Sequence, residues 1–181
     1  MEFPKHIALV VGLGNPGEDY ARTYHNTGVL ALHELARGVS FSPIAGKRFA
    51  YAKHKGYIFI QPLTLMNTSG TAVKNALRYF KIKPEVMLVA HDDSDIESGK
   101  WRLDFGRGSA GHRGVASIIE TLGTKNFWRF RIGIRGKKWG RSLKRRKAGT
   151  FVLQPISPED RKSIYLAIEG FTTKFTENVK P

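Results

Sequence analysis

The sequence predicts a single α/β domain, a three-layer sandwich in which helices flank a mixed, mostly parallel central sheet. Short apolar segments rich in branched side chains alternate along the chain with segments whose apolar residues recur at helical spacing. This alternation is typical of a sheet covered by helices on both faces. One pair of strand-like segments is joined too closely for a helical crossover, so we expect a mixed sheet. A chain of 181 residues suits one domain, and we expect residues 1–181 to form it.

The first predicted strand covers residues 6–13, a short apolar run that ends at glycine. A turn is expected next, in GNPGEDY. From Val29 onward the apolar residues recur at helical spacing, and Asn26 or Thr27 can cap this helix. The chain is therefore expected to open as strand, loop and helix.

A β-hairpin is predicted next. Residues 48–55 and 57–62 are both short and rich in aromatic or β-branched side chains, and a single glycine separates them. Residues 69–80 then return to helical spacing, and Thr68 or Ser69 can cap the helix that they form.

The second half of the chain is expected to add four strands and two helices. The strands are short apolar or alternating segments at residues 86–93, 100–105, 127–135 and 150–154. The helices have apolar residues at helical spacing in 115–122 and 159–171. Residues 106–114 are too rich in glycine for either structure.

Charge is the most informative feature of the composition. The chain has 30 lysines and arginines against 15 acids, a formal net charge of +15. Such a field favours a polyanion, nucleic acid first, although a basic surface can also serve solubility. Residues 135–147 hold eight basic residues and no acid, and we expect 136–148 to form a basic inserted loop. Such runs are more often solvated, but Trp139 within this one suits contact with an RNA backbone or single strand.

Several classes of protein are excluded or disfavoured by composition. The chain has no cysteine, which excludes a disulfide framework and thiolate metal sites. No window approaches the roughly 20 apolar residues that a membrane-spanning helix needs. The first ten residues run directly into a strand-like pattern, so we expect neither a signal nor a transit peptide. A cytoplasmic location is the expectation.

Residues 12–17, GLGNPG, stand where a dinucleotide-binding fingerprint would stand, directly after the first strand. In that fingerprint the last glycine opens a helix, whereas here EDYARTYHNTG intervenes. We therefore interpret the segment mainly as a tight turn.

Three polar side chains are expected to meet at one edge of the sheet. Asn15 and Asp92 each follow a buried strand, and His25 lies on the loop after the first of these. Ligands of open α/β sheets bind at the carboxyl ends of the strands. Most histidines only satisfy hydrogen bonds, but a nearby carboxylate can fix the imidazole tautomer so that the other nitrogen takes a proton from water.

Other residues near this edge have two interpretations. Asp92, Asp93 and Asp95, with His91, could instead gather oxygen ligands around Mg²⁺ or another metal. Asn67 could donate a hydrogen bond to an oxyanion or simply form part of a turn.

The glycine-rich segment 106–114 has two interpretations as well. Its backbone amides, with Arg107, His112 and Arg113, could bind phosphate, or it could be an ordinary mobile loop.

Four segments, in order along nearly the whole chain, resemble the signatures of the bacterial peptidyl-tRNA hydrolase family. They are VVGLGNPGEDYARTYHNTG, QPLTLMNTSG, AHDDSDIESG and GSAGHRGVASII. The resemblance implies a single α/β domain that needs no cofactor and no metal. It also implies hydrolysis of the ester between a peptide and the 3′ end of tRNA. We expect peptidyl-tRNA to be the partner, with no membrane and no protein partner, and we expect a monomer.

The same resemblance implies roles for individual residues. His25 would be the general base, Asp92 would orient it, and Asn15 and Asn67 would place the substrate and water or stabilise the intermediate. Further residues expected to contact the substrate are Met66 in the peptide groove, His112 over the tRNA end, Arg131 at a tRNA phosphate, and Tyr20, Arg102 and Arg113.

Two positions depart from the family pattern. Arg113 stands where the family usually has asparagine, and Asp104 stands where a lysine is expected. Arg102 and the basic loop could compensate by binding phosphates elsewhere.

Two alternatives to the esterase remain open from sequence. One is a non-catalytic RNA-binding relative acting in splicing or at the ribosome, which would not need His25, Asp92, Asn15 and Asn67 together. The other is a metal-dependent phosphoesterase.

Overall fold

The computed structural model describes residues 3–136 and 151–181. Seven strands form one sheet in the order β2-β3-β4-β1-β5-β7-β6. The strands are β1 (Leu9–Gly12), β2 (Ser42–Pro43), β3 (Phe49–His54), β4 (Tyr57–Pro62), β5 (Met87–Glu97), β6 (Trp101–Phe105) and β7 (Trp128–Arg135). The four central strands run parallel, whereas β2, β3 and β6 pair antiparallel toward the two edges. The predicted mixed, mostly parallel sheet is confirmed.

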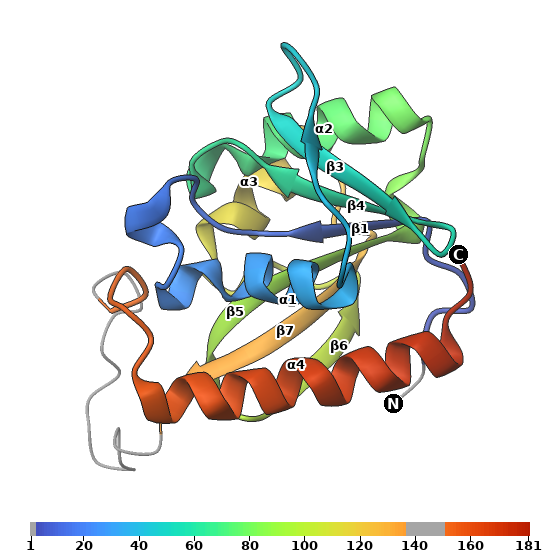
Figure 1. Cartoon of the computed structure of the whole chain (residues 1–181). Coiled ribbons are helices and arrows are strands. Elements are labelled where there is room, and N and C mark those ends of the chain that lie inside the picture. The colour runs from blue at the N-terminus through green and yellow to red at the C-terminus, as the bar shows by residue number, and fades with distance from the viewer. Residues whose placement is uncertain (1–2, 137–150) are drawn as a thin grey trace.

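Helices cover both faces of this sheet (Figure 1). α1 (Thr27–Leu35) and α4 (Pro158–Asn178) pack on one face, and α2 (Ser69–Phe80) and α3 (Arg113–Leu122) pack on the other. Alternate side chains of the strands enter two separate apolar cores, which is why the buried strands read as continuous apolar runs. The three-layer prediction is confirmed. Four 3-10 turns complete the described elements: η1 (Glu18–Tyr20), η2 (Tyr24–Asn26), η3 (Met66–Thr68) and η4 (Pro84–Val86).

Two glycines let α1 cross the sheet closely enough to place the loop before it. A Cβ at Gly12 would lie 2.5 Å from the Gly28 carbonyl oxygen, and one at Gly28 would lie 2.4 Å from the Ala90 carbonyl oxygen. Neither position has room for a side chain. Gly12, part of GLGNPG, thus serves helix packing, and the helix itself begins at Thr27 as predicted.

The predicted hairpin is confirmed, with Lys55 and Gly56 as its two turn residues. Both have positive φ, 48° and 84°, which matches the twist that a two-residue hairpin turn requires. The predicted helix at 69–80 has the same bounds in the structure, and Thr68 occupies its N-cap position. The Thr68 hydroxyl, however, donates to the Leu65 carbonyl rather than capping.

The predicted strand at 150–154 is wrong. Phe151–Gln154 is a turn in which the Gln154 N–H donates to the Phe151 carbonyl. Phe151 and Val152 are both buried, but within the described residues they do not pair with the sheet. The carbonyls of Val152 and Gln154 instead accept from η2, so this turn helps to fix the position of His25.

The last helix is longer than predicted, because Phe175, one helical turn beyond Phe171, continues the buried stripe. The expected basic loop at 136–148 falls almost entirely on residues 137–150, outside the described residues.

Candidate active site

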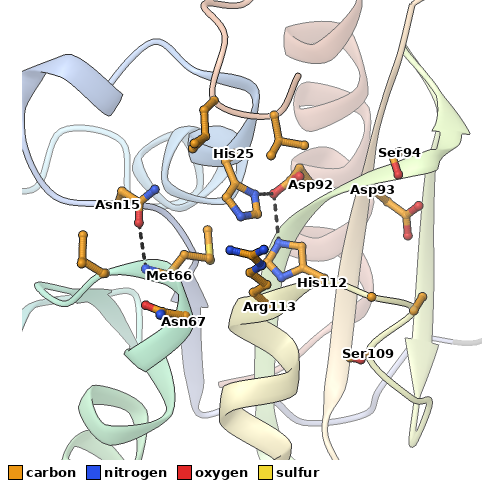
Figure 2. Close-up of a pocket in the computed structure, with 15 residues that line it drawn as sticks. Asn15, His25, Met66, Asn67, Asp92, Asp93, Ser94, Ser109, His112 and Arg113 are labelled. Carbon is orange, nitrogen blue, oxygen red and sulfur yellow. Dashed lines mark hydrogen bonds and ion pairs between the residues drawn. The ribbon is translucent and has the colours of Figure 1, made fainter. Parts of the chain in front are cut away.

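A pocket of about 620 Å³ opens beyond the carboxyl end of β1 and beside residues 92–94 of β5. Figure 2 shows side chains from segments far apart in the sequence converging on it. Seven of the predicted site residues line the pocket: Asn15, His25, Met66, Asn67, Asp92, His112 and Arg113. Tyr20, Arg102 and Arg131 are not among its lining residues.

His25 and Asp92 meet as the strand-end argument predicted. The His25 Nδ1 atom lies 2.9 Å from the Asp92 Oδ1 atom. The His25 backbone is held by a 2.8 Å hydrogen bond to the Val152 carbonyl. Because the carboxylate accepts, Nδ1 carries the proton and Nε2 is left as the basic nitrogen. Nε2 has no hydrogen-bond partner among the described residues, and the ring lines the pocket.

His112 is a third member of this cluster, which the sequence did not predict. Its Nε2 lies 3.0 Å from the same Asp92 Oδ1, and its Nδ1 accepts from the Val115 N–H at 3.2 Å as the N-cap of α3. Accepting at Nδ1 fixes the proton on Nε2, which donates to Asp92. The imidazole is 8% exposed, so it lies within the site rather than projecting over it.

Asp92 is thus a buried carboxylate held by two imidazole N–H donors. Burial alone would raise the pKa of Asp92, but His112 and His25, through charge and hydrogen bonds, lower that pKa well below its ordinary value. The Asp92 carboxylate therefore stays ionised at neutral pH. It can fix the tautomer of His25 and stabilise the imidazolium form.

His91 lies behind this cluster and is 3% exposed. Its Nδ1 donates to the Asp92 carbonyl at 2.7 Å, and its ring packs edge-on against His112 with centroids 4.6 Å apart. Burial, and then the charge that His112 can carry, lower the pKa of His91 well below its ordinary value. His91 is therefore a neutral packing residue at neutral pH.

A chain of amides connects the first loop to the wall of the pocket. The Asn26 side chain accepts from the Asn15 N–H at 2.8 Å and donates to the Asn15 carbonyl at 2.9 Å. The Asn15 Oδ1 in turn accepts from the Met66 N–H at 2.8 Å. The Asn15 amide NH₂ has no partner among the described residues, so it can donate to a bound molecule.

Asn67 and Arg113 present unpaired polar groups to the pocket. Asn67 lies in η3 and Arg113 begins α3, and both are exposed. Within the described residues neither side chain makes a hydrogen bond or ion pair. Close packing between their segments is possible because Gly114 has no side chain; a Cβ there would lie 2.4 Å from the Met66 sulfur.

Buried Arg129 anchors the segment 106–112 beside the pocket. Its Nη1 donates to the Gly108 carbonyl at 2.6 Å, while the Arg129 side chain is 1% exposed. Burial, together with the charge of Arg131, lowers the pKa of Arg129 to about 10, so the group remains charged.

Arg131 is engaged by two carboxylates. Its Nε lies 2.7 Å from Asp93 Oδ2, and its Nη1 lies 2.7 Å from Asp104 Oδ2. Burial works to lower the pKa of Arg131, but the hydrogen bonds that Arg131 donates to Asp104 and Asp93 outweigh it, and the pKa is raised. Contact between Arg131 and a tRNA phosphate stays a prediction, and in this geometry it would require a carboxylate to be displaced.

The acids of β5 do not form one metal-binding set. Asp92 faces His25 and His112, whereas Asp93 pairs with Arg131 and accepts from the Asp95 N–H. Within the described residues, the only group of at least three such side chains with ligand atoms close enough for a metal is His25, Asp92 and His112. Metal binding at His112 Nε2 would move its proton to Nδ1, against the Val115 N–H. This donor set suits protons better than a cation.

Comparison with known proteins gives a consistent result. The family model described as peptidyl-tRNA hydrolase matches residues 9–180. A peptidyl-tRNA hydrolase of Aquifex aeolicus is 44% identical, with 90% of this chain and 85% of that protein covered. One from Thermus thermophilus is 42% identical, with coverages of 90% and 84%.

Solved structures agree with the sequence comparison. The crystal structure of peptidyl-tRNA hydrolase from Acinetobacter baumannii superposes with a TM-score of 0.84 at 32% identity, covering 98% of this chain and 91% of that one. In the described part of the chain, no helix is long and apolar enough to cross a membrane. Sequence and fold together show that the chain belongs to the peptidyl-tRNA hydrolase family.

Proposed function

We propose that this protein hydrolyses the ester bond between a peptide, or an N-blocked amino acid, and the 3′ end of tRNA, with His25 as general base. One observation carries the proposal: Asp92 fixes the proton on His25 Nδ1, while Nε2 has no partner among residues 3–136 and 151–181 and faces a pocket large enough for the ester. The names of the relatives and the basic charge of the chain support this substrate.

The reaction follows from the tautomer of His25. Nε2 takes a proton from a water molecule as the water oxygen attacks the ester carbonyl carbon, which gives a tetrahedral intermediate and an imidazolium. The Asp92 carboxylate stabilises that imidazolium. When the intermediate collapses, the bond to the ribose 3′ oxygen breaks and His25 returns the proton to that oxygen. The peptide leaves as a carboxylic acid, which then loses its proton to solvent.

The amides of Asn15 and Asn67 supply the remaining interactions. The Asn15 NH₂ group can place the substrate or water, because its oxygen is already held by the Met66 N–H. The exposed Asn67 side chain lines the pocket and can donate to the oxyanion of the intermediate. Met66 is buried in the pocket wall and offers an apolar surface to the peptide.

The decisive experiment is a release assay with N-acetyl-aminoacyl-tRNA. His25→Ala should abolish turnover, a loss on the order of 10³-fold or more, and leave tRNA affinity nearly unchanged. His33→Ala is the matched control, because His33 is an exposed histidine of α1 that is not among the lining residues of the pocket. Near-normal turnover in His25→Ala would defeat the mechanism.

We further propose that the protein acts as a cytoplasmic monomer with peptidyl-tRNA as its partner. The strongly positive net charge supports the RNA partner. Light scattering coupled to size exclusion, with and without tRNA, tests the monomer.

A further inference from the structure

A row of charged side chains runs from the pocket wall to the edge of the sheet. Asp93 on β5 lines the pocket, Arg131 lies next to it on β7, and Asp104 lies beyond on the edge strand β6. Arg102 is opposite Arg131 in the antiparallel register, so both side chains occupy the same face of the sheet. An RNA whose 3′ end carries the ester into the pocket could extend over this row of side chains.

The inner part of the row is closed to an incoming phosphate. The Nε and Nη2 atoms of Arg131 contact the Asp93 carboxylate, and its Nη1 atom contacts the Asp104 carboxylate, with N–O distances of 2.6 to 2.7 Å. The three side chains are only 7% to 17% exposed. A phosphate could reach Arg131 only by leaving a largely buried carboxylate without its partner, which is strongly unfavourable.

The outer part of the row is open. Arg107 is 70% exposed, and its Nε is 3.6 Å from the Asp104 Oδ1, a weak contact that solvent screens. Arg102 is exposed and has no hydrogen bond or ion pair within the described residues. Two residues after Arg107, Ser109 enters the pocket wall, so Arg107 belongs to the segment that borders the site.

We propose that Asp104 determines how this edge of the sheet binds RNA. Asp104 holds Arg131 in ion pairs inside the sheet, where Arg131 stabilises the fold. The RNA phosphodiesters are bound by Arg102 and Arg107 instead. The inference rests on the proposed function for its RNA partner. It assigns Arg131 a structural part and makes Asp104 a residue that limits RNA affinity.

The experiment measures binding rather than turnover, with uncharged tRNA as the probe in fluorescence anisotropy between about 50 and 200 mM salt. Each phosphate contact contributes about 0.9 to the slope of log affinity against log salt. The double variant Arg102→Gln/Arg107→Gln should lower that slope by about 2 and weaken binding about tenfold or more. Lys180→Gln is the control, because Lys180 pairs with the chain before β1, at the opposite end of the strands.

Asp104→Asn provides the opposite change while preserving side-chain shape. It should tighten binding about threefold or more and steepen the slope by up to about 1, because one cation is released from its counter-ion. Glu177→Gln, the same charge change at the far end of α4, should leave both quantities unchanged. Unaltered affinity and slope in Asp104→Asn would overturn the proposal.

Arg131→Gln distinguishes this stabilising role from a direct contact with RNA. The expected result is a lower melting temperature with the salt slope of the folded fraction retained. A slope reduced by about 1 at an unchanged melting temperature would show that Arg131 itself binds phosphate and would overturn the proposal. If Arg131→Gln does not fold, the Asp104→Asn result decides.

The two proposals fail in different ways. Salt-dependent tRNA binding without ester release in the wild-type protein would defeat the proposed function alone. Ester release with a salt slope insensitive to Arg102, Arg107 and Asp104 would defeat only this inference.

Discussion

Asp92 and Asp93 are neighbours on β5, both are buried, and both line the pocket, yet their surroundings differ completely. Asp92 accepts from two imidazoles, groups that can act as general acids or bases. Asp93 accepts from a guanidinium, which keeps its protons. Successive residues of a strand point to opposite faces of the sheet, so two adjacent residues form a site suited to proton transfer on one face and a permanent ion pair on the other. The partner, more than the acid, determines what a buried carboxylate can do.

Of the two acids, Asp92 is expected to give the larger effect when it is replaced, and that effect is on kcat. Asp92→Asn should lower kcat on the order of 10²-fold, less than His25→Ala, because an amide can donate to His25 Nδ1 and favour the wrong tautomer. Single-turnover release of N-acetyl-aminoacyl-tRNA measures the loss. A variant with unimpaired turnover would erase the distinction between the two acids.

Loss of the ion pairs around Asp93 should lower the stability of the protein rather than its kcat. Arg131→Gln leaves Asp93 and Asp104 largely buried without their partner, and we expect a loss of about 3 kcal/mol in the free energy of unfolding. Urea denaturation measures it, with Arg135→Gln, an exposed residue at the end of the same strand, as control. Equal stability of the two variants would mean that the ion pairs contribute little.

As the pH falls, the free energy of unfolding should be lowered first through His91 and only later through Asp92. The pKa of His91 is lowered by burial, so below about pH 6.5 the unfolded chain binds a proton that the folded chain does not. The free energy of unfolding should then fall with decreasing pH by up to about 1.4 kcal/mol per pH unit from this group. The lowered pKa of Asp92 acts in the same direction, but only below about pH 4.

His91→Gln tests this assignment in urea unfolding at about pH 7 and about pH 5. The variant should lose less stability than the wild-type protein over that interval, and exposed His33→Gln should behave like the wild type. The same pH slope in all three proteins would remove His91 from the explanation.

The smallest effect is expected at Asn67. Its amide is exposed and has no hydrogen-bond partner in the part of the chain that the structure describes. Asn67→Ala should therefore lower kcat about fivefold, less than the loss of a rigidly held oxyanion donor. Rates under saturating substrate give the value. A loss below about threefold would argue against contact with the oxyanion.

Much of this arrangement could be predicted from sequence because it depends on local rules. β1 ends close to where its apolar run ends, whereas β5 continues past its apolar run to Glu97. Polar side chains that follow the apolar runs of neighbouring parallel strands lie at one edge, and this rule placed Asn15, His25 and Asp92 together. Those rules do not say which groups will touch. The bond from His112 to Asp92 depends on how the segment 106–112 folds back, and nothing in its glycine-rich composition specifies that path.

Segments whose structure depends on distant partners were harder to predict. Residues 150–154 have the composition of a strand, but from Phe151 onward the backbone turns and bonds to η2 instead of to the sheet. The pairing of Arg131 with Asp104 requires the register of β6 against β7, which periodicity alone does not supply. Arg129 and Arg131 are two residues apart in β7 and therefore lie on one face of the sheet, which was the available signal.

His112 is the N-cap residue of α3 and also donates to Asp92, so the conformation of the first turn of α3 affects the basicity of that carboxylate. Unwinding of the first turn of α3 would free Nδ1 from the Val115 amide and let the ring change tautomer. The acid at 92 would then lose one of its two donors and become more basic toward His25. A change in the first turn of α3 would therefore alter the reactivity of His25, and amide exchange at Val115 would report the loss of the bond to His112.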